Sequence, residues 1–167
     1  MMEAVVFYIL ASVLLIFGLL VITRTNPIGS ALSMVGAFAA LAGLYATLSA
    51  SLAAIIQILV YAGGIMVLVI FVIMLLNLGP EDLKPMKARA PRVLLALLLV
   101  LGVVLGPLFL TVFPAGQWKM AVLPADFGTI SSVGEKIFSE FLFPFEMLSL
   151  LLLTAVVGAL VLSKRKL

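Results

Sequence analysis

The stretch 52-LAAIIQILVYAGGIMVLVIFVIMLLN-77 decides the fold, because it is almost wholly apolar and has no charged side chain. A helix that crosses a bilayer needs about 20 consecutive, mostly apolar residues, so this stretch predicts one transmembrane helix. It belongs to a longer uncharged run, residues 25–80. That run is too long for one span and fits two spans joined at Ser49-Ala50-Ser51, where the apolar character weakens.

The whole chain shares this apolar character. It has 167 residues, of which 65% are hydrophobic and 10% are charged, whereas soluble domains carry about 25% charged residues. Such a composition cannot cover a water-facing surface, so the bilayer must be the main solvent. We predict an all-α integral membrane protein in which residues 1–167 form a single domain, with transmembrane helices at about 3–23, 28–49, 52–77, 92–113 and 142–163.

Local signals mark the helix ends. Asn26-Pro27 separates the first two helices, because proline is tolerated in the first helical turn and disfavours helix before it. Ahead of the last span, Ser132 and Glu135 fit the S-x-x-E pattern of a capping box. Apolar residues then recur on one helical face, which predicts a short amphipathic helix at about 132–141 on the outer membrane surface.

Basic residues are distributed unevenly between the two sides that five spans would create. Eight of the ten, namely Arg24 and those within 84–92 and 164–166, fall on one side, and only Lys119 and Lys136 fall on the other. Cytoplasmic loops of membrane proteins are enriched in Lys and Arg. The amino terminus is therefore predicted outside and the carboxyl terminus in the cytoplasm. The net charge of +3 is then a topology signal, and nucleic-acid binding is not expected.

The chain contains neither histidine nor cysteine. These residues are the usual ligands of haem, iron–sulfur clusters, zinc and copper, and they supply many nucleophile and base pairs of covalent catalysis. A disulfide is excluded as well, and no glycine-rich nucleotide-binding motif occurs. We therefore expect no catalytic residue, no metal site and no cofactor bound by this chain.

The third predicted helix carries two polar residues and a glycine pair. Gln57 and Tyr61 lie one turn apart, and Gly63 and Gly64 follow near the middle of the span. An amide or a phenol at this depth needs a partner, because lipid offers none. Paired glycines weaken a helix by about 1 kcal/mol each relative to alanine and favour a kink or a π-bulge. Two interpretations remain open: a satisfied interhelical hydrogen bond with close packing, or a helix that switches between two backbone arrangements.

The second predicted helix carries a stripe of small residues spaced alternately four and three apart. In lipid such a stripe lets helix backbones approach closely. It predicts a packing surface for another helix of this chain or of another subunit. The stripe consists of Gly29, Ser33, Gly36, Ala40, Gly43, Thr47 and Ala50.

Glu146 is the only acidic residue well inside a predicted helix. Charged groups inside a span are functional candidates by default. A structural interpretation is also open, because a carboxylate in the first turn after Pro144 is favoured by the helix dipole. Ser149 lies on the same face and can help to solvate the carboxylate.

The run 57-QILVYAGGIMVLVIFVIMLLN-77 resembles the signature of the J-subunit family of bacterial respiratory complex I. That complex is an NADH-quinone oxidoreductase, and the mitochondrial counterpart of the subunit is NADH dehydrogenase subunit six. The segments 23-TRTNPIGSAL-32, 42-AGLYATL-48 and 128–166 are also similar to that family and follow in the same order.

The resemblance implies a five-helix subunit without cofactors in the inner (cytoplasmic) membrane of bacteria, within a proton-pumping oxidoreductase. It implies that NADH, FMN, iron–sulfur clusters and quinone bind other subunits. It also implies that the A, H and K subunits and lipid surround this chain.

For the site, the resemblance implies a π-bulge around residues 61–64, whose helix rotates to open or close a water path. Some family members carry glutamate at the position of Gln57, whereas the glutamine of this chain cannot titrate. The glutamate at the position of Glu146 belongs to the family pattern.

Three functions remain in view. The leading hypothesis is a pump subunit that couples quinone reduction elsewhere to proton movement through a flexible third helix. The second is the equivalent subunit of a ferredoxin- or F420-dependent oxidoreductase or of a cation/proton antiporter complex, and the third is a purely structural scaffold. A stand-alone transporter is disfavoured because the chain has no internal repeat. The candidate residues for a proton path or for coupling are Gln57, Tyr61, Gly63, Gly64 and Glu146.

Overall fold

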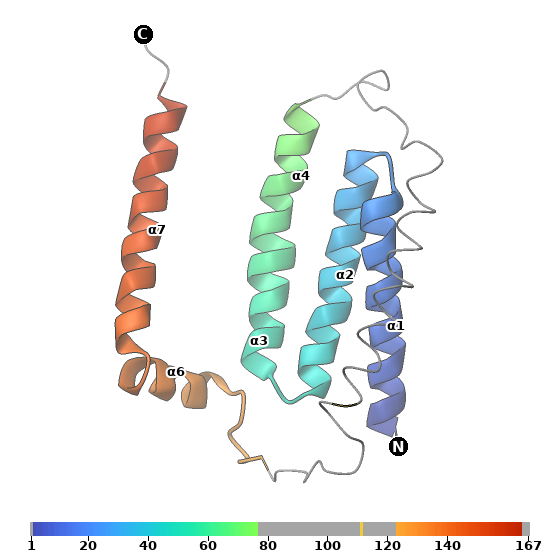
Figure 1. The fold of residues 1–167 in the computed structure, drawn as a ribbon, viewed down its shortest axis with the longest axis vertical. Helices are drawn as coiled ribbons and strands as arrows, with labels where there is room; N and C mark the ends of the chain where they lie inside the picture. The colour runs from blue at the N-terminus through green and yellow to red at the C-terminus, as the bar shows by residue number, and fades with distance from the viewer. Residues whose placement is uncertain (1, 77–110, 112–122, 165–167) are drawn as a thin grey trace. The chain divides into compact units, whose positions relative to one another are not determined.

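A computed structural model describes residues 2–76, 111 and 123–164 of the chain, and every structural statement below concerns these residues. In this part of the chain all regular structure is helical (Figure 1). The helices are α1 (Met2–Thr23), α2 (Pro27–Thr47), α3 (Ser51–Ile56), the π-helix η1 (Gln57–Ile65), α4 (Met66–Leu75), α6 (Ile130–Ser139) and α7 (Leu142–Ser163).

Four helical stretches in the described ranges are long and apolar enough to cross a membrane. The third of them is α3, η1 and α4 in succession, which form one rod (Figure 1). They confirm four predicted spans to within two residues at each end, and the chain is a multi-pass membrane protein. The predicted helix 92–113 lies outside the described residues, and the membrane orientation stays a prediction. The four stretches are Met2–Thr23, Pro27–Thr47, Ser51–Leu75 and Leu142–Ser163.

The chain divides into two compact units, Met1–Pro124 and Ala125–Leu167, and each is described by itself. In the first unit α2 lies between α1 and the rod of α3, η1 and α4, and it contacts both (Figure 1). Small side chains let helices approach closely where lipid removes the usual hydrophobic drive for association. The buried side chains of α2 are nearly all small: Ala31, Ser33, Ala37, Ala40, Ala42 and Leu44.

The stripe of small residues on α2 meets α1 of the same chain at two positions. A Cβ atom added to Gly36 would lie 2.6 Å from Cε1 of Phe17, so the Phe17 ring rests directly on the glycine. A Cβ atom added to Gly43 would lie 3.0 Å from Cδ1 of Leu10. At these two positions, the helix that approaches α2 is therefore α1.

The connection between α1 and α2 confirms the boundary predicted at Asn26-Pro27. The Asn26 side-chain oxygen Oδ1 accepts hydrogen bonds from the backbone N–H groups of Ile28, at 2.9 Å, and Gly29, at 3.4 Å. These N–H groups have no partner within the helix, which is why an N-cap residue stabilises it. The Ser30 hydroxyl donates to the Val21 carbonyl and ties the start of α2 to the end of α1.

The turn between α2 and α3 falls where the sequence predicts it. The Ala50 N–H donates to the Tyr45 carbonyl at 2.9 Å, and the Ser49 N–H donates to the Ala46 carbonyl at 3.2 Å. This pair of bonds is a Schellman motif, which needs a left-handed residue after the helix. Ser49 takes that conformation, with φ of 59°. The apolar run is thus interrupted by a tight turn that leaves α2 and α3 antiparallel.

In the second unit α6 begins earlier than predicted. Its N-cap is Thr129, which has extended backbone (φ −77°, ψ 161°) and whose Oγ1 accepts from the Ser132 N–H at 3.3 Å. The start expected from a helix at 132–141, with a capping box of Ser132 and Glu135, is therefore wrong. Ser132 lies inside α6, and its hydroxyl donates to the Asp126 carbonyl at 2.7 Å. The position of α6 at a membrane surface stays a prediction.

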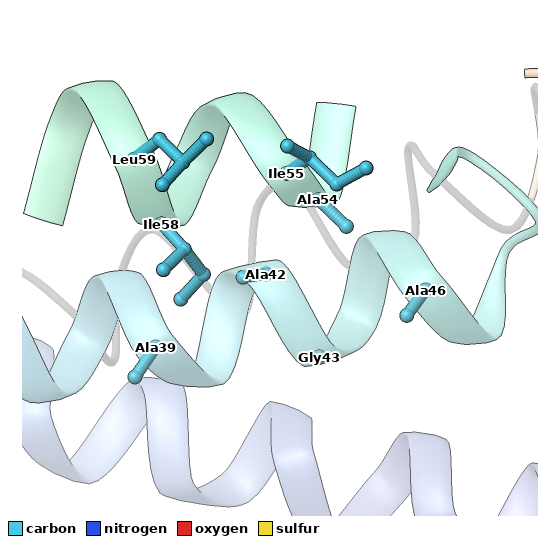
Figure 2. A pocket seen from close by; sticks show the side chains of 8 residues that line it. All are labelled: Ala39, Ala42, Gly43, Ala46, Ala54, Ile55, Ile58 and Leu59. Carbon is cyan, nitrogen blue, oxygen red and sulfur yellow. The ribbon is translucent and has the colours of Figure 1, made fainter. Parts of the chain in front are cut away.

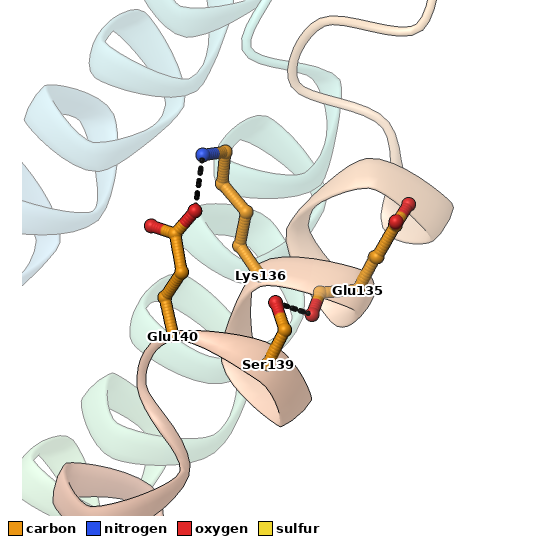
Figure 3. Close-up of polar contacts among 4 residues, drawn as sticks. All are labelled: Glu135, Lys136, Ser139 and Glu140. Carbon is orange, nitrogen blue, oxygen red and sulfur yellow. Dashed lines mark hydrogen bonds and ion pairs between the residues drawn. The ribbon is translucent and has the colours of Figure 1, made fainter.

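Figure 3 shows the polar side of α6. Lys136 Nζ and Glu140 Oε1 lie 3.4 Å apart and form an exposed ion pair, which contributes little stability because water screens it. The Glu135 carboxylate points away from this pair (Figure 3), and the Glu135 backbone carbonyl accepts from the Ser139 hydroxyl at 2.7 Å. Glu135 therefore makes no capping contact in the described helix.

Candidate functional site

The middle of the third span is a π-helix. Residues Gln57–Ile65 form nine residues of this structure, in which backbone N–H groups donate to carbonyls five residues earlier. At its end the Met66 N–H donates to the Tyr61 carbonyl. The π-bulge implied at residues 61–64 is present, and it begins four residues earlier than expected. Because π-helical turns are rare and concentrate at functional sites, η1 is the principal candidate site.

The two glycines of η1 accommodate the wider turn differently. A Cβ atom on Gly63 would lie 3.2 Å from the carbonyl oxygen of Ile58, which is tighter than nine in ten real contacts of this kind. A Cβ atom on Gly64 would lie 3.9 Å from the carbonyl oxygen of Leu59, which is an ordinary van der Waals contact. In the π-helical form Gly63 thus has little room for a side chain, whereas Gly64 has enough.

Gln57 is the first residue of η1 and is 5% exposed. Its amide makes no side-chain hydrogen bond to another residue of the described ranges. It lies six residues into the span that starts at Ser51, which is about 9 Å along the helix axis. No side-chain N or O atom of the described residues is both fully buried and without a hydrogen-bond partner, so the Gln57 amide supplies hydrogen-bonding capacity in an otherwise apolar stretch.

Tyr61, four residues after Gln57, meets an aromatic side chain of α2. Its ring and that of Phe38 are arranged edge to face, with ring centroids 5.9 Å apart and an interplanar angle of 67°. Such pairs contribute about 0.5–1.5 kcal/mol beyond the area that they bury. This contact joins η1 to α2.

Both ends of η1 are anchored by buried side chains. Gln57 is buried at the start, and Met66, directly after η1, is 1% exposed and the most buried large side chain of the described residues. The intervening residues are half-buried or exposed within this chain. Buried side chains therefore hold the two ends of η1, whereas the side chains between them are much less constrained by packing within this chain.

The second candidate, Glu146, lies in α7 of the other unit. The helix begins at Leu142, and Glu146 lies two residues after Pro144, one position beyond the first turn of α7. The Ser149 hydroxyl donates to the backbone carbonyl of Glu146 at 2.7 Å and not to the carboxylate. The rings of Phe138 and Phe145 pack edge to face, 5.2 Å apart, and connect α6 to α7. Glu146 and η1 belong to different units, so each is described alone.

In the described ranges no group of three or more Asp, Glu, His or Cys side chains converges to hold a metal ion. What the site can offer is hydrogen bonding by Gln57 and Tyr61 and a change in backbone pairing through η1. Neither property transfers electrons or forms a covalent intermediate.

Two features of the site do not follow from the sequence pattern. The first is the contact of Phe38 with Tyr61. Its only sequence signal is that Phe38 is the sole aromatic residue between 28 and 44, among small and aliphatic neighbours. The second is the length of η1, because a glycine pair marks a weak point of a helix without fixing where the altered pairing starts.

Comparison with known proteins gives a consistent family. Residues 17–162 match the model of the family described as NADH-ubiquinone/plastoquinone oxidoreductase chain 6. The NAD(P)H-quinone oxidoreductase chain 6 of Nostoc sp. is 38% identical over 165 residues, which cover 98% of this chain and 80% of that relative. F(420)H(2) dehydrogenase subunit J of Methanosarcina mazei is 33% identical over 163 residues, with 98% and 92% covered. NADH-quinone oxidoreductase subunit J of Escherichia coli is 32% identical over 160 residues, with 92% and 82% covered.

Proposed function

The chain belongs to the NADH-ubiquinone/plastoquinone oxidoreductase chain 6 family, and on this premise we propose that it is a membrane subunit that couples quinone reduction in neighbouring subunits to proton translocation. The observation that carries the coupling role is the nine-residue π-helix in the third span. Because the chain has no His and no Cys, we infer that it contributes to the coupling by a change in conformation and not by carrying electrons.

The shape change that we propose is conversion of η1 between π-helical and α-helical pairing. An α-helix has 3.6 residues per turn, so each residue by which the pairing shifts rotates the helix beyond it by about 100°. The segment that rotates is α4, Met66–Leu75, whose sequence MVLVIFVIML is apolar on every side. Rotation therefore moves no polar group of α4 into lipid, which keeps the free-energy difference between the two arrangements small.

The same change alters the polar residues of the site. In the π-helical form the Tyr61 ring is held by Phe38. Conversion would move Tyr61 relative to α2, while Gln57, at the start of η1, would stay near its buried position. The Gln57 amide can order water, and the moving helix would open or close the path of that water. Because Gln57 cannot titrate, the protons are carried mainly by groups on neighbouring subunits, with Glu146 as the candidate carboxylate of this chain.

The remaining parts of the proposal concern the surroundings. The chain binds no cofactor, and NADH, FMN, iron–sulfur clusters and quinone are held by other subunits. Its neighbours are the A, H and K subunits and lipid, in a bacterial inner membrane with the amino terminus outside. The names of the relatives, which are quinone oxidoreductase and dehydrogenase subunits, support a place beside other subunits of such a complex.

The substitution Gly64→Val tests the proposed switch. A side chain at Gly64 has room in the π-helical form, so the complex should assemble. Valine removes the backbone freedom of glycine and has a stiff, β-branched side chain, and we expect the proton-to-electron ratio to fall about twofold. The ratio is measured with purified complex in sealed vesicles, and assembly is measured by native gel electrophoresis.

Gly18→Val is the matched control, because a Cβ atom at Gly18 in α1 meets no atom within 4 Å. It should leave both assembly and the ratio unchanged. A normal proton-to-electron ratio in fully assembled Gly64→Val complex would refute the switch.

A second candidate function rests on the similarity to F(420)H(2) dehydrogenase subunit J of Methanosarcina mazei, which covers 98% of this chain. Its identity of 33% is close to the 32% of the Escherichia coli NADH-quinone oxidoreductase subunit. The electron donor is decided by the subunits that co-purify with this chain in mild detergent. An NADH-oxidising module supports the first function, whereas an F420H2-oxidising module supports the second.

A further inference from the structure

Phe38 places a large side chain on a part of α2 that otherwise carries small ones. In the segment 36-GAFAALAG-43 its neighbours are glycine, alanine and one leucine. The Phe38 ring is half-buried and meets the Tyr61 ring edge to face, with ring centroids 5.9 Å apart. The two rings therefore connect the middle of α2 to the middle of η1.

Beside this ring pair the side chains of α2 are too short to pack closely against η1. Ala39 and Ala42 of α2 and Ile58 and Leu59 of η1 line a space of about 550 Å³ between the two elements (Figure 2). Ile58 and Leu59 both stay exposed within this chain. The ring of Phe38 thus supplies a contact with η1 that the alanines beside it do not.

Conversion of η1 to α-helical pairing would separate the two rings, because Tyr61 lies inside the segment whose pairing changes. A shift by one residue rotates the helix by about 100°, and the outer side-chain atoms lie about 5–6 Å from the helix axis, so this rotation displaces them by about 8 Å. Aromatic pairs interact at centroid separations of about 4.5–7 Å. The contact of Phe38 with Tyr61 therefore belongs to the π-helical form.

We propose that Phe38 is a positioning residue that sets the ratio of the π-helical to the α-helical form of η1 by holding Tyr61. This inference rests on the proposed function, because it requires that the two forms interconvert. The free energy of an edge-to-face aromatic contact corresponds to a change in an equilibrium of about two- to tenfold. Phe38 has no titratable group, so it acts on this ratio and not on proton transfer.

Cryo-electron microscopy of the intact complex measures the ratio directly. The unaltered and the Phe38→Leu complexes are frozen during turnover with the donor that the co-purified module oxidises, NADH or F420H2. The particles are then sorted by the backbone pairing of residues 57–65. We expect Phe38→Leu to lower the ratio of π-helical to α-helical particles about two- to tenfold, because leucine stays apolar but removes the ring.

The conservative variant Phe38→Tyr keeps the ring and should keep the ratio close to that of the unaltered complex. Leu32→Val is the matched control, since Leu32 is an exposed residue of the same helix, and it should leave the ratio unchanged. A merely structural Phe38 would instead lower the unfolding temperature in Phe38→Leu and leave the ratio as it is.

Tyr61→Leu identifies the residue through which Phe38 acts. Tyr61→Leu alone should lower the ratio by a factor similar to that of Phe38→Leu. Adding Phe38→Leu to Tyr61→Leu should then have no further effect, because the effects of contacting residues are not additive.

Failure of this inference differs from failure of the proposed function. Equal ratios in the unaltered and Phe38→Leu complexes, or a further fall in the ratio when Phe38→Leu is added to Tyr61→Leu, would overturn the role of Phe38 and leave the switch in place. Exclusively π-helical particles in the unaltered complex and in both single variants would contradict the switch itself, and this inference with it.

Discussion

Gln57 brings together three properties that seldom coincide in one side chain of a membrane helix. It is polar, it is 5% exposed, and it opens a π-helix. The polar residue and the glycine pair are visible in the sequence, but the depth of burial is not, because it depends on how close α2 approaches. Glutamine provides hydrogen-bonding capacity at this position without a charge that can titrate.

The substitution Gln57→Leu separates a structural amide from a functional one. Leucine is of similar size, and placing it among apolar neighbours carries none of the desolvation cost of an amide. We expect the purified complex to unfold at an equal or higher temperature and to pump fewer protons per electron. A normal proton-to-electron ratio together with normal turnover would instead favour the scaffold hypothesis for this subunit.

At the scale of the element, α2 shows why small residues matter. Gly36 leaves space for the Phe17 ring, and Gly43 leaves space for Leu10. Close approach of α1 and α2 therefore depends on the absence of side chains at two positions, more than on particular side chains that attract one another.

Gly36→Ala tests this packing directly. Its Cβ atom would lie 2.6 Å from the Phe17 ring, and forcing atoms into a packed interface costs about 1–3 kcal/mol. We expect a lower midpoint of thermal unfolding for the detergent-solubilised complex, whereas Gly18→Ala, in open space, should have little effect.

Phe17→Leu provides the double-mutant test of the same contact. If the clash is the cause, Phe17→Leu should restore part of the stability lost in Gly36→Ala, because the effects of contacting residues are not additive. Strictly additive losses would show that the two residues do not interact as described.

The helices themselves could be predicted well from the sequence, and their details less well. Long uncharged runs and the Asn26-Pro27 signal place four spans to within two residues, because charge and proline act locally. The start of α6 was missed because Thr129 caps the helix ahead of a plausible capping box at Ser132. Pro144 is the third residue of α7, where it is tolerated because the first four N–H groups of a helix need no intrahelical partner.

The extent of η1 and the partner of the small stripe could not be predicted for a different reason. Both depend on contacts between helices. A stripe of glycine and alanine indicates close packing but does not identify the residues that pack against it. Phe17 and Leu10, which fill these positions, are ordinary apolar residues in the sequence of α1.

At the scale of the whole molecule, the chain is poor in titratable groups within its spans. Glu146 is the only Asp, Glu, Lys or Arg deeper than the first turn in the described membrane helices. In the proposed function, such a subunit supplies a helix that changes its backbone pairing and lines a water path. Most of the proton-carrying groups then belong to the neighbouring subunits.

Glu146→Gln tests whether this carboxylate takes part. Because the neighbours carry most protons in the proposed arrangement, we expect a mild effect, a less than about twofold fall in proton pumping. Pumping is measured with assembled complex in sealed vesicles, and Glu140→Gln, in the exposed ion pair of α6, serves as the control. Complete loss of assembly in Glu146→Gln would point to a structural role at the start of α7.

The contact of Phe17 with Gly36 also bears on how the protein is made. Residues 24–26 are the whole connection between α1 and α2, and the Asn26 cap and the Ser30 hydrogen bond lie at that connection. The described contacts between α1 and α2 therefore all lie within residues 2–47. During synthesis, which proceeds from the amino terminus, this pair can leave the ribosome and insert as a preassembled hairpin. The span that contains η1 would then pack against this pair.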